Sequence, residues 1–415
     1  MRAACFLLLA ALLLTAPVAA QSAITFPQGV ASGDVTDSQA MIWARTSVPA
    51  FARIEYGTSQ ALGTVWPSAG RAAEDTDLTA KIDLGNLRPA TRYFYRVVAE
   101  QGDQRGASLV GSFVTAPPAG DAADVTFAWS ADTSERFKPF TIYDAIRSQQ
   151  PQFFLFLGDT LYADVDCDAR TLAAYRSCSQ HNREDEAFQR FARSTSISAI
   201  WDDHEVANNF DRTHDRLPLG RRAFLEYWPI RTVEGEPGRM YRSFRWGRAL
   251  EIFILDARQY RSPPFQRDDA EKTLLGAAQK QWLLRGLEAS TAAFKVIASS
   301  VPLKYHGADS WEGYTTERNE VIDFITKRNI HRVVFLTADV HYAAVLRYKE
   351  GFVEAIVGPM GMLISSRRNV AGEPETEFSF NSSFTFGVVR VSGTALVIEI
   401  YDVNNRLLHR TIVDP

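Results

Sequence analysis

The hydrophobic pattern of this chain changes character at one place, and that change limits the folds it can adopt. Before residues 116–124, apolar residues alternate with polar ones, as in AMIWART, ARIEYG and YFYRVVAE, and Gly, Asp and Pro interrupt them at short intervals. This period of two predicts the half-buried strands of a β-sandwich. Residues 116–124 (APPAGDAAD) are rich in Pro, Gly and Ala and therefore indicate a linker.

Beyond the linker, fully apolar runs such as FFLFLG, LEIFILD and VVFLTA alternate with segments of helical period, such as FTIYDAIRSQQ, AAQKQWLLRGLEAS and RNEVIDFITKRN. Buried strands that alternate with amphipathic helices predict an α/β domain. The chain then returns to strands in FGVVRVSG and ALVIEIYD, which a tight turn joins. We therefore predict a sandwich domain over residues 21–117 and an α/β domain over residues 121–415.

The first twenty residues, MRAACFLLLAALLLTAPVAA, combine Arg2 with an apolar core and small residues before Gln21. This is the pattern of a secretory signal peptide, and no later segment reaches the roughly 18 uncharged apolar residues of a membrane span. We predict an exported protein, periplasmic or extracellular, with no integral membrane segment after signal removal. Loss of Arg2 takes Lys and Arg from 45 to 44 against 49 Asp and Glu, and a net charge of about −5 does not indicate nucleic-acid binding.

Cys5 leaves with the signal peptide, so Cys167 and Cys178 remain as a pair in a compartment where disulfides persist. An unbroken helix over residues 167–178 would place their Cα atoms about 16 Å apart, beyond the ~7 Å that a disulfide spans. A bridge therefore requires a break in that helix, and both states stay open at this point.

Ionisable residues follow four of the apolar runs. The carboxyl ends of strands form the ligand crevice of an open α/β sheet, so we expect these side chains to converge. Taken singly, an Asp after a strand is usually a helix N-cap, and a His is usually a hydrogen-bonded surface residue. Four strand ends of the same chemistry favour instead a metal site of oxygen and nitrogen donors, suited to Fe, Mn, Zn or Ca. The residues are Asp132 after VTFAWS, Asp159, Tyr162 and Asp164 after FFLFLG, Asp203 and His204 after ISAIW, and Asp339 and His341 after VVFLTA.

Two resemblances can be named. LRPATRYFYRV (residues 87–97) resembles a corner of fibronectin type III and immunoglobulin-like domains, where a Tyr hydroxyl bonds back to the main chain, which gives Tyr93 a structural role. GDTLYAD, WDDHEV followed by NN, LDARQYR, QKQWLLRGLEAS, SSVP and ADVH resemble the motifs of PhoD-type alkaline phosphatases, a branch of the metallophosphoesterase superfamily. That family carries an N-terminal sandwich before a four-layer α/β/β/α phosphatase domain, which holds a metal cluster, often iron with calcium.

The resemblance also implies roles for individual residues. Asp159 takes the place of a carboxylate that bridges metals, and His204 is a candidate for phosphate contact or general acid. Arg258 matches an arginine whose planar fork can hold a phosphoryl group, and the alternative is a structural residue under the crevice. The implied metal ligands are Asp132, Asp159, Tyr162, Asp203, Asn209, Asp339 and His341, and the implied catalytic groups are His204, Arg258 and His341.

Two positions depart from the family pattern. Where the first strand of the family ends in Ser-Cys-Gln, this chain has Ser130, Ala131 and Asp132, so a soft thiolate ligand is replaced by a hard carboxylate and the identity of the metal stays open. Ala338 stands where Gly is usual before the Asp of the last motif.

The resulting hypothesis is a secreted hydrolase of the alkaline phosphatase D type, which uses metal-activated hydroxide to cleave phosphate mono- and/or diesters. It would hold two or more metal ions, Fe and/or Ca, with Mn or Zn as alternatives. Its substrate would be a small phosphate ester or a phospholipid, and the sequence does not set the oligomeric state. One alternative is a phospholipase D-type phosphodiesterase on the same fold. A second alternative, from a different class, is a non-catalytic secreted binding protein with a structural metal site.

Overall fold

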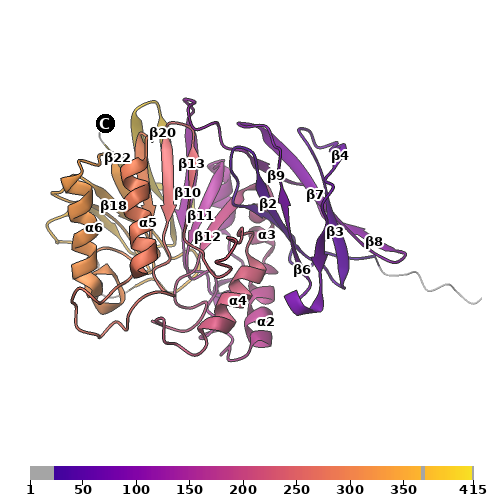
Figure 1. Ribbon diagram of the computed structural model, residues 1–415, viewed down its shortest axis with the longest axis horizontal. Coiled ribbons are helices and arrows are strands. Elements are labelled where there is room, and N and C mark those ends of the chain that lie inside the picture. The colour runs from indigo at the N-terminus through magenta and orange to yellow at the C-terminus, as the bar shows by residue number, and fades with distance from the viewer. Residues whose placement is uncertain (1–22, 366–369, 414–415) are drawn as a thin grey trace, which may run out of the picture.

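A computed structural model of the protein describes residues 23–365 and 370–413, so the predicted signal peptide lies outside the described residues. The strands before the linker form two small sheets and those after it form two large ones, which the purple and the magenta-to-yellow parts of Figure 1 show side by side. No helix in the described ranges is long and apolar enough to cross a membrane.

The two small sheets share an apolar core that alternating residues fill, among them Ile42, Ile54 and Val97. The predicted corner is present, because the Tyr93 hydroxyl accepts a hydrogen bond from the backbone N–H of Arg88 at 2.9 Å. One sheet contains β1 (Val30–Gly33), β2 (Ala40–Arg45) and β6 (Thr79–Leu84); the other contains β4 (Thr64–Val65), β3 (Ala50–Gly57), β7 (Arg92–Gln101) and β8 (Gln104–Ala107), with β5 (Gly70–Ala72) paired to β3 and β9 (Gly111–Val114) paired to β7.

In the first large sheet, three neighbouring strands run parallel, and the returning strands near the end of the chain extend it antiparallel. The parallel strands therefore present their carboxyl ends at one edge. The order is β12 (Ser196–Ile200), β11 (Phe153–Leu157), β10 (Val125–Ser130), β20 (Thr385–Ser392), β21 (Ala395–Asp402) and β22 (Leu407–Val413).

The second large sheet has four parallel strands at its centre and antiparallel strands beside them. The order is β13 (Arg242–Trp246), β14 (Leu250–Ile254), β15 (Phe294–Ala298), β16 (Val333–Thr337), β18 (Val353–Ile356), β17 (Ala343–Arg347) and β19 (Thr376–Phe380).

The two large sheets pack face to face, and helices cover their outer faces (Figure 1). Phe153 of the first sheet contacts the rings of Phe244 and Trp246 of the second. On the outer face of the first sheet, Phe191 of a covering helix packs on Phe154. The layers therefore follow the predicted α/β/β/α order. The helices are α1 (Ile142–Ser148), α2 (Leu172–Arg183), α3 (Glu186–Ser194), α4 (Leu217–Tyr227), α5 (Gly276–Ala289) and α6 (Thr315–Lys327).

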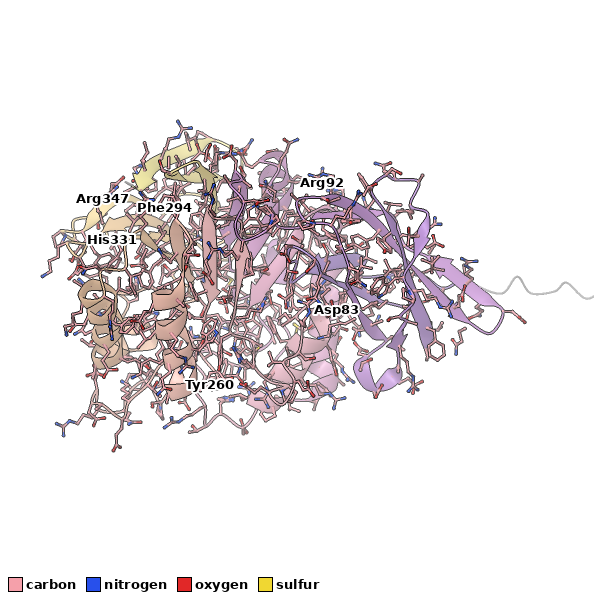
Figure 2. The ribbon with its side chains drawn as sticks, turned by 45° about the horizontal axis from the view of Figure 1, so that its top comes forward. Asp83, Arg92, Tyr260, Phe294, His331 and Arg347 are labelled. Atoms are coloured by element: carbon pink, nitrogen blue, oxygen red, sulfur yellow. A yellow bond between two sulfur atoms is a disulfide. The ribbon has the colours of Figure 1, made fainter. Side chains whose placement is uncertain are left out.

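Polar contacts join the sandwich to the segment around α4. Arg231 donates two hydrogen bonds to Asp83, which Figure 2 labels, and its backbone N–H donates to Asp34. The Lys81 ammonium donates to the carbonyls of Leu225 and Ile230, both at 3.0 Å. These contacts hold the sandwich against the large sheets.

Cys167 and Cys178 form a disulfide, with their Cα atoms 6.0 Å apart. The break that a bridge requires is present, because α2 begins only at Leu172, after the Thr171 side chain has capped its first turn. Cys167 therefore lies in a loop and can fold back toward Cys178 on the helix.

Reduction of this disulfide is expected to lower the free energy of unfolding by about 3 kcal/mol, since the bridge closes a short loop in the unfolded chain. Denaturant unfolding with and without a reductant measures the change. The double variant Cys167→Ser/Cys178→Ser is the control, on which the reductant should have no effect. Two reactive thiols in unreduced, denatured protein would show that the bridge does not form.

Candidate metal centre

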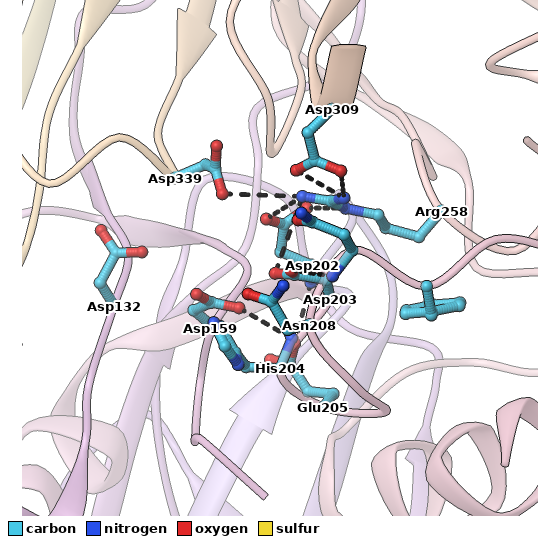
Figure 3. Close-up of polar contacts among 12 residues, drawn as sticks. Asp132, Asp159, Asp202, Asp203, His204, Glu205, Asn208, Arg258, Asp309 and Asp339 are labelled. Atoms are coloured by element: carbon cyan, nitrogen blue, oxygen red, sulfur yellow. Dashed lines mark hydrogen bonds and ion pairs between the residues drawn. The ribbon is translucent and has the colours of Figure 1, made fainter. Parts of the chain in front are cut away.

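The carboxyl ends of strands from both large sheets bring acidic side chains to one place (Figure 3). Asp132 follows β10, Asp159 follows β11, residues 202–205 follow β12, and Asp339 follows β16. This is the convergence that the strand-end pattern predicts. Residues far apart in the chain are neighbours here because parallel strands end at the same edge.

The backbone at this edge adopts a conformation that residues other than glycine rarely take. Asp132, Asp159, Asn209, Asp339 and His341 all have positive φ, between 47° and 73°. Such residues cost free energy, and they cluster at functional sites, where the surrounding structure imposes them. The strain here serves to direct several predicted ligands to one centre.

Asp132 provides the strongest indication of a cation site. Its side chain has no exposed surface, and neither carboxylate oxygen has a hydrogen-bond partner among the described residues. A Cβ on Gly358 would lie 2.4 Å from one of these oxygens, so the glycine leaves room for the carboxylate. Burial and the neighbouring carboxylates raise the pKa of Asp132 well above its usual range. A buried carboxylate without a partner fits a metal ligand.

Asp132 belongs to a first group of potential ligands, with Asp159 and His341, whose donor atoms all lie within 4.8 Å of one another. The Tyr162 hydroxyl is 2.9 Å from Nε2 of His341 and adds a phenolic oxygen. Burial lowers the pKa of His341 to about 4, so its imidazole is neutral and can offer a lone pair at neutral pH.

Asp159 also belongs to a second group, with Asp203 and His204. One carboxylate that serves two adjacent groups has the placement required to bridge two ions. A third group consists of Asp202, Asp203 and Asp339. The first two groups share Asp159 and the last two share Asp203, so they form one continuous cluster of donors.

His204 is held on two sides. Its Nδ1 lies 2.7 Å from a carboxylate oxygen of Asp164, and its ring centre lies 4.3 Å from that of Tyr162, with the two planes tilted by 33°. Burial lowers the pKa of His204, but Asp203 and Asp164 outweigh burial and raise that pKa to about 9. In the absence of a metal, this histidine carries a proton at neutral pH.

Arg258 lies under the cluster and has no exposed surface. Its Nε and Nη2 donate to the two oxygens of Asp202 at 2.5 Å and 2.7 Å, and its Nη1 donates to Asp309 at 2.8 Å. Two further carboxylates, Asp339 and Asp203, lie 3.6 Å and 3.7 Å from Nη2. The planar fork is occupied by carboxylates of the protein, and this position favours the structural alternative over a phosphoryl clamp.

Asn209 is near the cluster but faces carboxylates. Its backbone N–H donates to Asp203 at 2.6 Å, and its amide group lies 2.9 Å from Asp309 and 3.2 Å from Asp203. Asp309, in a short 3₁₀ turn (Gly307–Asp309), was not predicted from the sequence, because no strand end or motif marks it. Asp202 was also left without a role, although its place beside Asp203 in IWDDHE offered a signal.

Comparisons with known proteins agree with this geometry. The model of the PhoD-like phosphatase family matches residues 127–383, more than half of the chain, and the model of the N-terminal domain of PhoD-like phosphatases matches residues 13–117. This chain belongs to the PhoD-like phosphatase family. The resemblance that the sequence motifs indicate is therefore confirmed.

Among its relatives is alkaline phosphatase D of Bacillus subtilis (strain 168), to which this PhoD-like chain is 27% identical over 383 residues. The match covers 77% of this chain and 65% of that protein, so the chain spans less than two thirds of the length of its relative. A solved structure of PhoD matches with a TM-score of 0.83 at 21% identity, over 94% of this chain and 93% of the other. A purple acid phosphatase from yellow lupin (Lupinus luteus) seeds matches with a TM-score of 0.67 at 12% identity, over 94% and 74%. These two structures confirm the predicted fold class.

The metal-free protein is expected to lose stability as the pH rises. Burial first, and neighbouring carboxylates second, raise the pKa of Asp132 and Asp159 well above their usual range. A carboxyl group whose pKa is higher in the folded state than in the unfolded state contributes its full stabilisation at pH values below the unfolded pKa. This stabilisation is lost as the pH rises toward the folded pKa. At pH values between the unfolded pKa and the raised folded pKa, each such group should cost roughly 1.4 kcal/mol per pH unit.

Denaturant unfolding of chelated and metal-loaded protein at several pH values measures this loss. The loaded protein should not show it, since metal binding requires deprotonated carboxylates and strengthens with pH. A chelated protein that gains stability with pH over the same range would contradict the assignment of these buried carboxylates.

Proposed function

We propose that this protein is an exported, metal-dependent phosphoric ester hydrolase that cleaves phosphate mono- and/or diesters. The observation that carries the proposal is the placement of Asp159, which belongs to two adjacent groups of potential ligands. Two-metal hydrolases need such a carboxylate to hold both ions at a fixed separation. Membership of the PhoD-like phosphatase family supports the proposal.

The donors fit two or more hard or borderline metal ions. Asp132, Asp159, Tyr162 and His341 would hold one ion. Asp203, which shares one group with Asp159 and another with Asp339, would hold the next. Carboxylate, phenol and imidazole donors suit iron and calcium, with manganese or zinc as alternatives. Asp132 adds a hard oxygen where the family pattern has a thiolate, so we expect no iron–thiolate colour.

Bound metal ions would supply an activated water at neutral pH and positive charge for the phosphoryl oxygens. The chain would supply the remaining functions. His204, protonated and held by Asp164 at 2.7 Å, would give a proton to the leaving oxygen. Arg258 would hold Asp202 and Asp309 in place beneath the cluster, which fixes the floor of the site.

His204→Ala is expected to slow the hydrolysis of esters with poor leaving groups far more than that of esters with good ones, because a nitrophenolate leaves without a proton and an alkoxide does not. We expect the rate of hydrolysis of an alkyl phosphate to fall by roughly a hundredfold or more. Steady-state rates on matched alkyl and nitrophenyl esters measure the difference, with Asp268→Asn, in an exposed loop, as the control. Equal losses on both esters would assign His204 to metal binding instead.

Turnover tests the function as a whole. Purified protein is loaded with each metal in turn and assayed on a chromogenic phosphomonoester and diester, before chelation, after it and after return of the metal. We expect hydrolysis of at least one class, loss on chelation and recovery with metal. A faster diester reaction would favour the phosphodiesterase. Bound metal without turnover of either class would favour the non-catalytic binding protein.

Export would be tested separately. The N-terminal sequence of protein recovered from outside the cytoplasm should begin after residue 20, if residues 1–20 are a cleaved signal peptide. The disulfide between Cys167 and Cys178 supports an oxidising compartment. An uncleaved chain in the cytoplasm would contradict export.

A further inference from the structure

A small, partly open cavity lies behind the metal centre, between α2, α4 and the loop that follows β11. Aromatic and aliphatic side chains form most of its wall, and the charged or amide groups in that wall are Asn182, Arg183 and Glu205. Its volume is about 20 Å³. A cavity needs ~10–15 Å³ to hold one water molecule, so this one is slightly larger. The cavity can hold one water molecule or one monatomic ion, and it is too small for a phosphate ester.

Arg183, the last residue of α2, is the unusual member of this wall. Its residue is 5% exposed, and its guanidinium carbon lies 4.3 Å from the ring centre of Trp43 and 4.4 Å from that of Trp228. Among residues 23–365 and 370–413, no carboxylate forms an ion pair with it. Its Nη2 is buried and has no hydrogen-bond partner in the same ranges.

This arrangement leaves the buried positive charge of Arg183 without a directly paired carboxylate in the described ranges, since Glu205 lines the same cavity but forms no ion pair with it. The two indole rings and the negative end of α2 offset part of the cost of burying the cation. None of them accepts a hydrogen bond in the plane of the guanidinium, where its N–H groups point. Buried charges are otherwise paired or bound to a counter-ion. Within the described chain Arg183 has no ion-pair partner, but it lines a cavity that can hold a counter-ion.

We propose that this cavity is a binding site for one monatomic anion of the size of chloride or bromide, held by Arg183. The competing occupant is a water molecule, because Oδ1 of Asn182 is also buried without a partner among the residues that the structure describes, and a water could join it to Arg183. Water would satisfy hydrogen bonds but leave the charge unbalanced, whereas a halide balances the charge.

The site is distinct from the metal centre but shares a wall with it. Asn182 donates from Nδ2 to the carbonyl of Thr160, next to Asp159, and the Thr160 hydroxyl donates to Glu205 at 2.7 Å. Trp43, which covers Arg183, belongs to the sandwich. A bound anion would therefore stabilise the junction of the sandwich, α2 and the metal-site loop.

The first experiment measures thermal unfolding of the full protein while chloride or bromide rises from about 10 mM to about 500 mM, with gluconate keeping the ionic strength constant. We expect the Tm to rise with halide in the parent protein and in Arg147→Met, which removes the same charge from an exposed position on α1. In Arg183→Met, the halide effect should vanish. A parent Tm that does not depend on halide, or a dependence that Arg183→Met retains, would overturn the proposal.

The second experiment needs no variant and decides the matter if Arg183→Met does not fold. Crystals of the parent protein are soaked in bromide, and anomalous scattering is measured. The proposal expects an anomalous peak beside the Arg183 guanidinium. Density for a water molecule at that place, without an anomalous peak, would overturn the anion site.

Discussion

Asp159→Asn is expected to reduce turnover at least a hundredfold, while the chain still folds. The amide keeps the shape of the side chain but gives up one anionic oxygen of the carboxylate that joins two ligand groups. If that carboxylate fixes two ions relative to each other, its loss misplaces the activated water. Steady-state kinetics with metal analysis on the same preparation measures both quantities.

The stability of the same variant should change in opposite directions with and without metal. Chelated Asp159→Asn should be as stable as the parent or more stable, because repulsion between the buried carboxylates is relieved. Its stabilisation by metal should be smaller, since a ligand stabilises a fold in proportion to its binding. Asp268→Asn is the matched control and should behave as the parent does. A variant with full metal content and less than a tenfold loss in rate would move the bridging role to Asp132 or Asp339.

Arg258→Met is expected to lower the free energy of unfolding by about 3–5 kcal/mol, because it leaves the buried Asp202 carboxylate without its cation, while Asp309 keeps its ion pair with Arg261. Arg258→Lys is the matched variant: it keeps the charge but cannot donate to both oxygens of Asp202 through a planar fork, so we expect an intermediate loss. Urea unfolding of chelated protein measures both changes.

In this pair of variants, kcat/KM should fall together with the free energy of unfolding. Asp202 is adjacent to Asp203 in the loop that carries part of the metal cluster, so a change at Asp202 also displaces potential ligands. The outcome that contradicts this assignment is specific. If Arg258→Met unfolds within about 1 kcal/mol of the parent while kcat/KM falls by more than a hundredfold, Arg258 contacts the phosphoryl group during the reaction, as the motif resemblance implies.

The strand-end residues could be predicted because their placement follows from the chain itself. Apolar runs of five or six residues predict buried strands, and parallel strands bring whatever follows them to one edge. No knowledge of long-range contacts was therefore needed to predict that Asp132, Asp159, Asp203 and Asp339 lie together. The alternating pattern before the linker predicted the sandwich in the same way. The hydrogen bond of Tyr93 is what the resemblance of residues 87–97 to a fibronectin type III or immunoglobulin-like corner implies.

The parts that could not be predicted depend on contacts between distant segments. Asp309 enters the site from a short turn that no hydrophobic pattern predicts, and it accepts a hydrogen bond from Nη1 of Arg258. The break before α2 depends on a cap at Thr171, which decides whether the disulfide can close. In the sequence, Arg183 is an ordinary charged residue near a helix end. Its burial follows from the packing of Trp43, from the other domain, and Trp228 on its guanidinium.

The most direct test measures the rate of ester hydrolysis as a function of the number of metal ions bound per chain. Protein is chelated, the metal is returned in steps, and each sample is divided between elemental analysis and the assay. We expect two or more ions per chain at full activity, a rate that rises with occupancy and no rate in the chelated protein. Full activity in protein that binds less than about one ion in ten chains would contradict a metal centre as the site of the reaction.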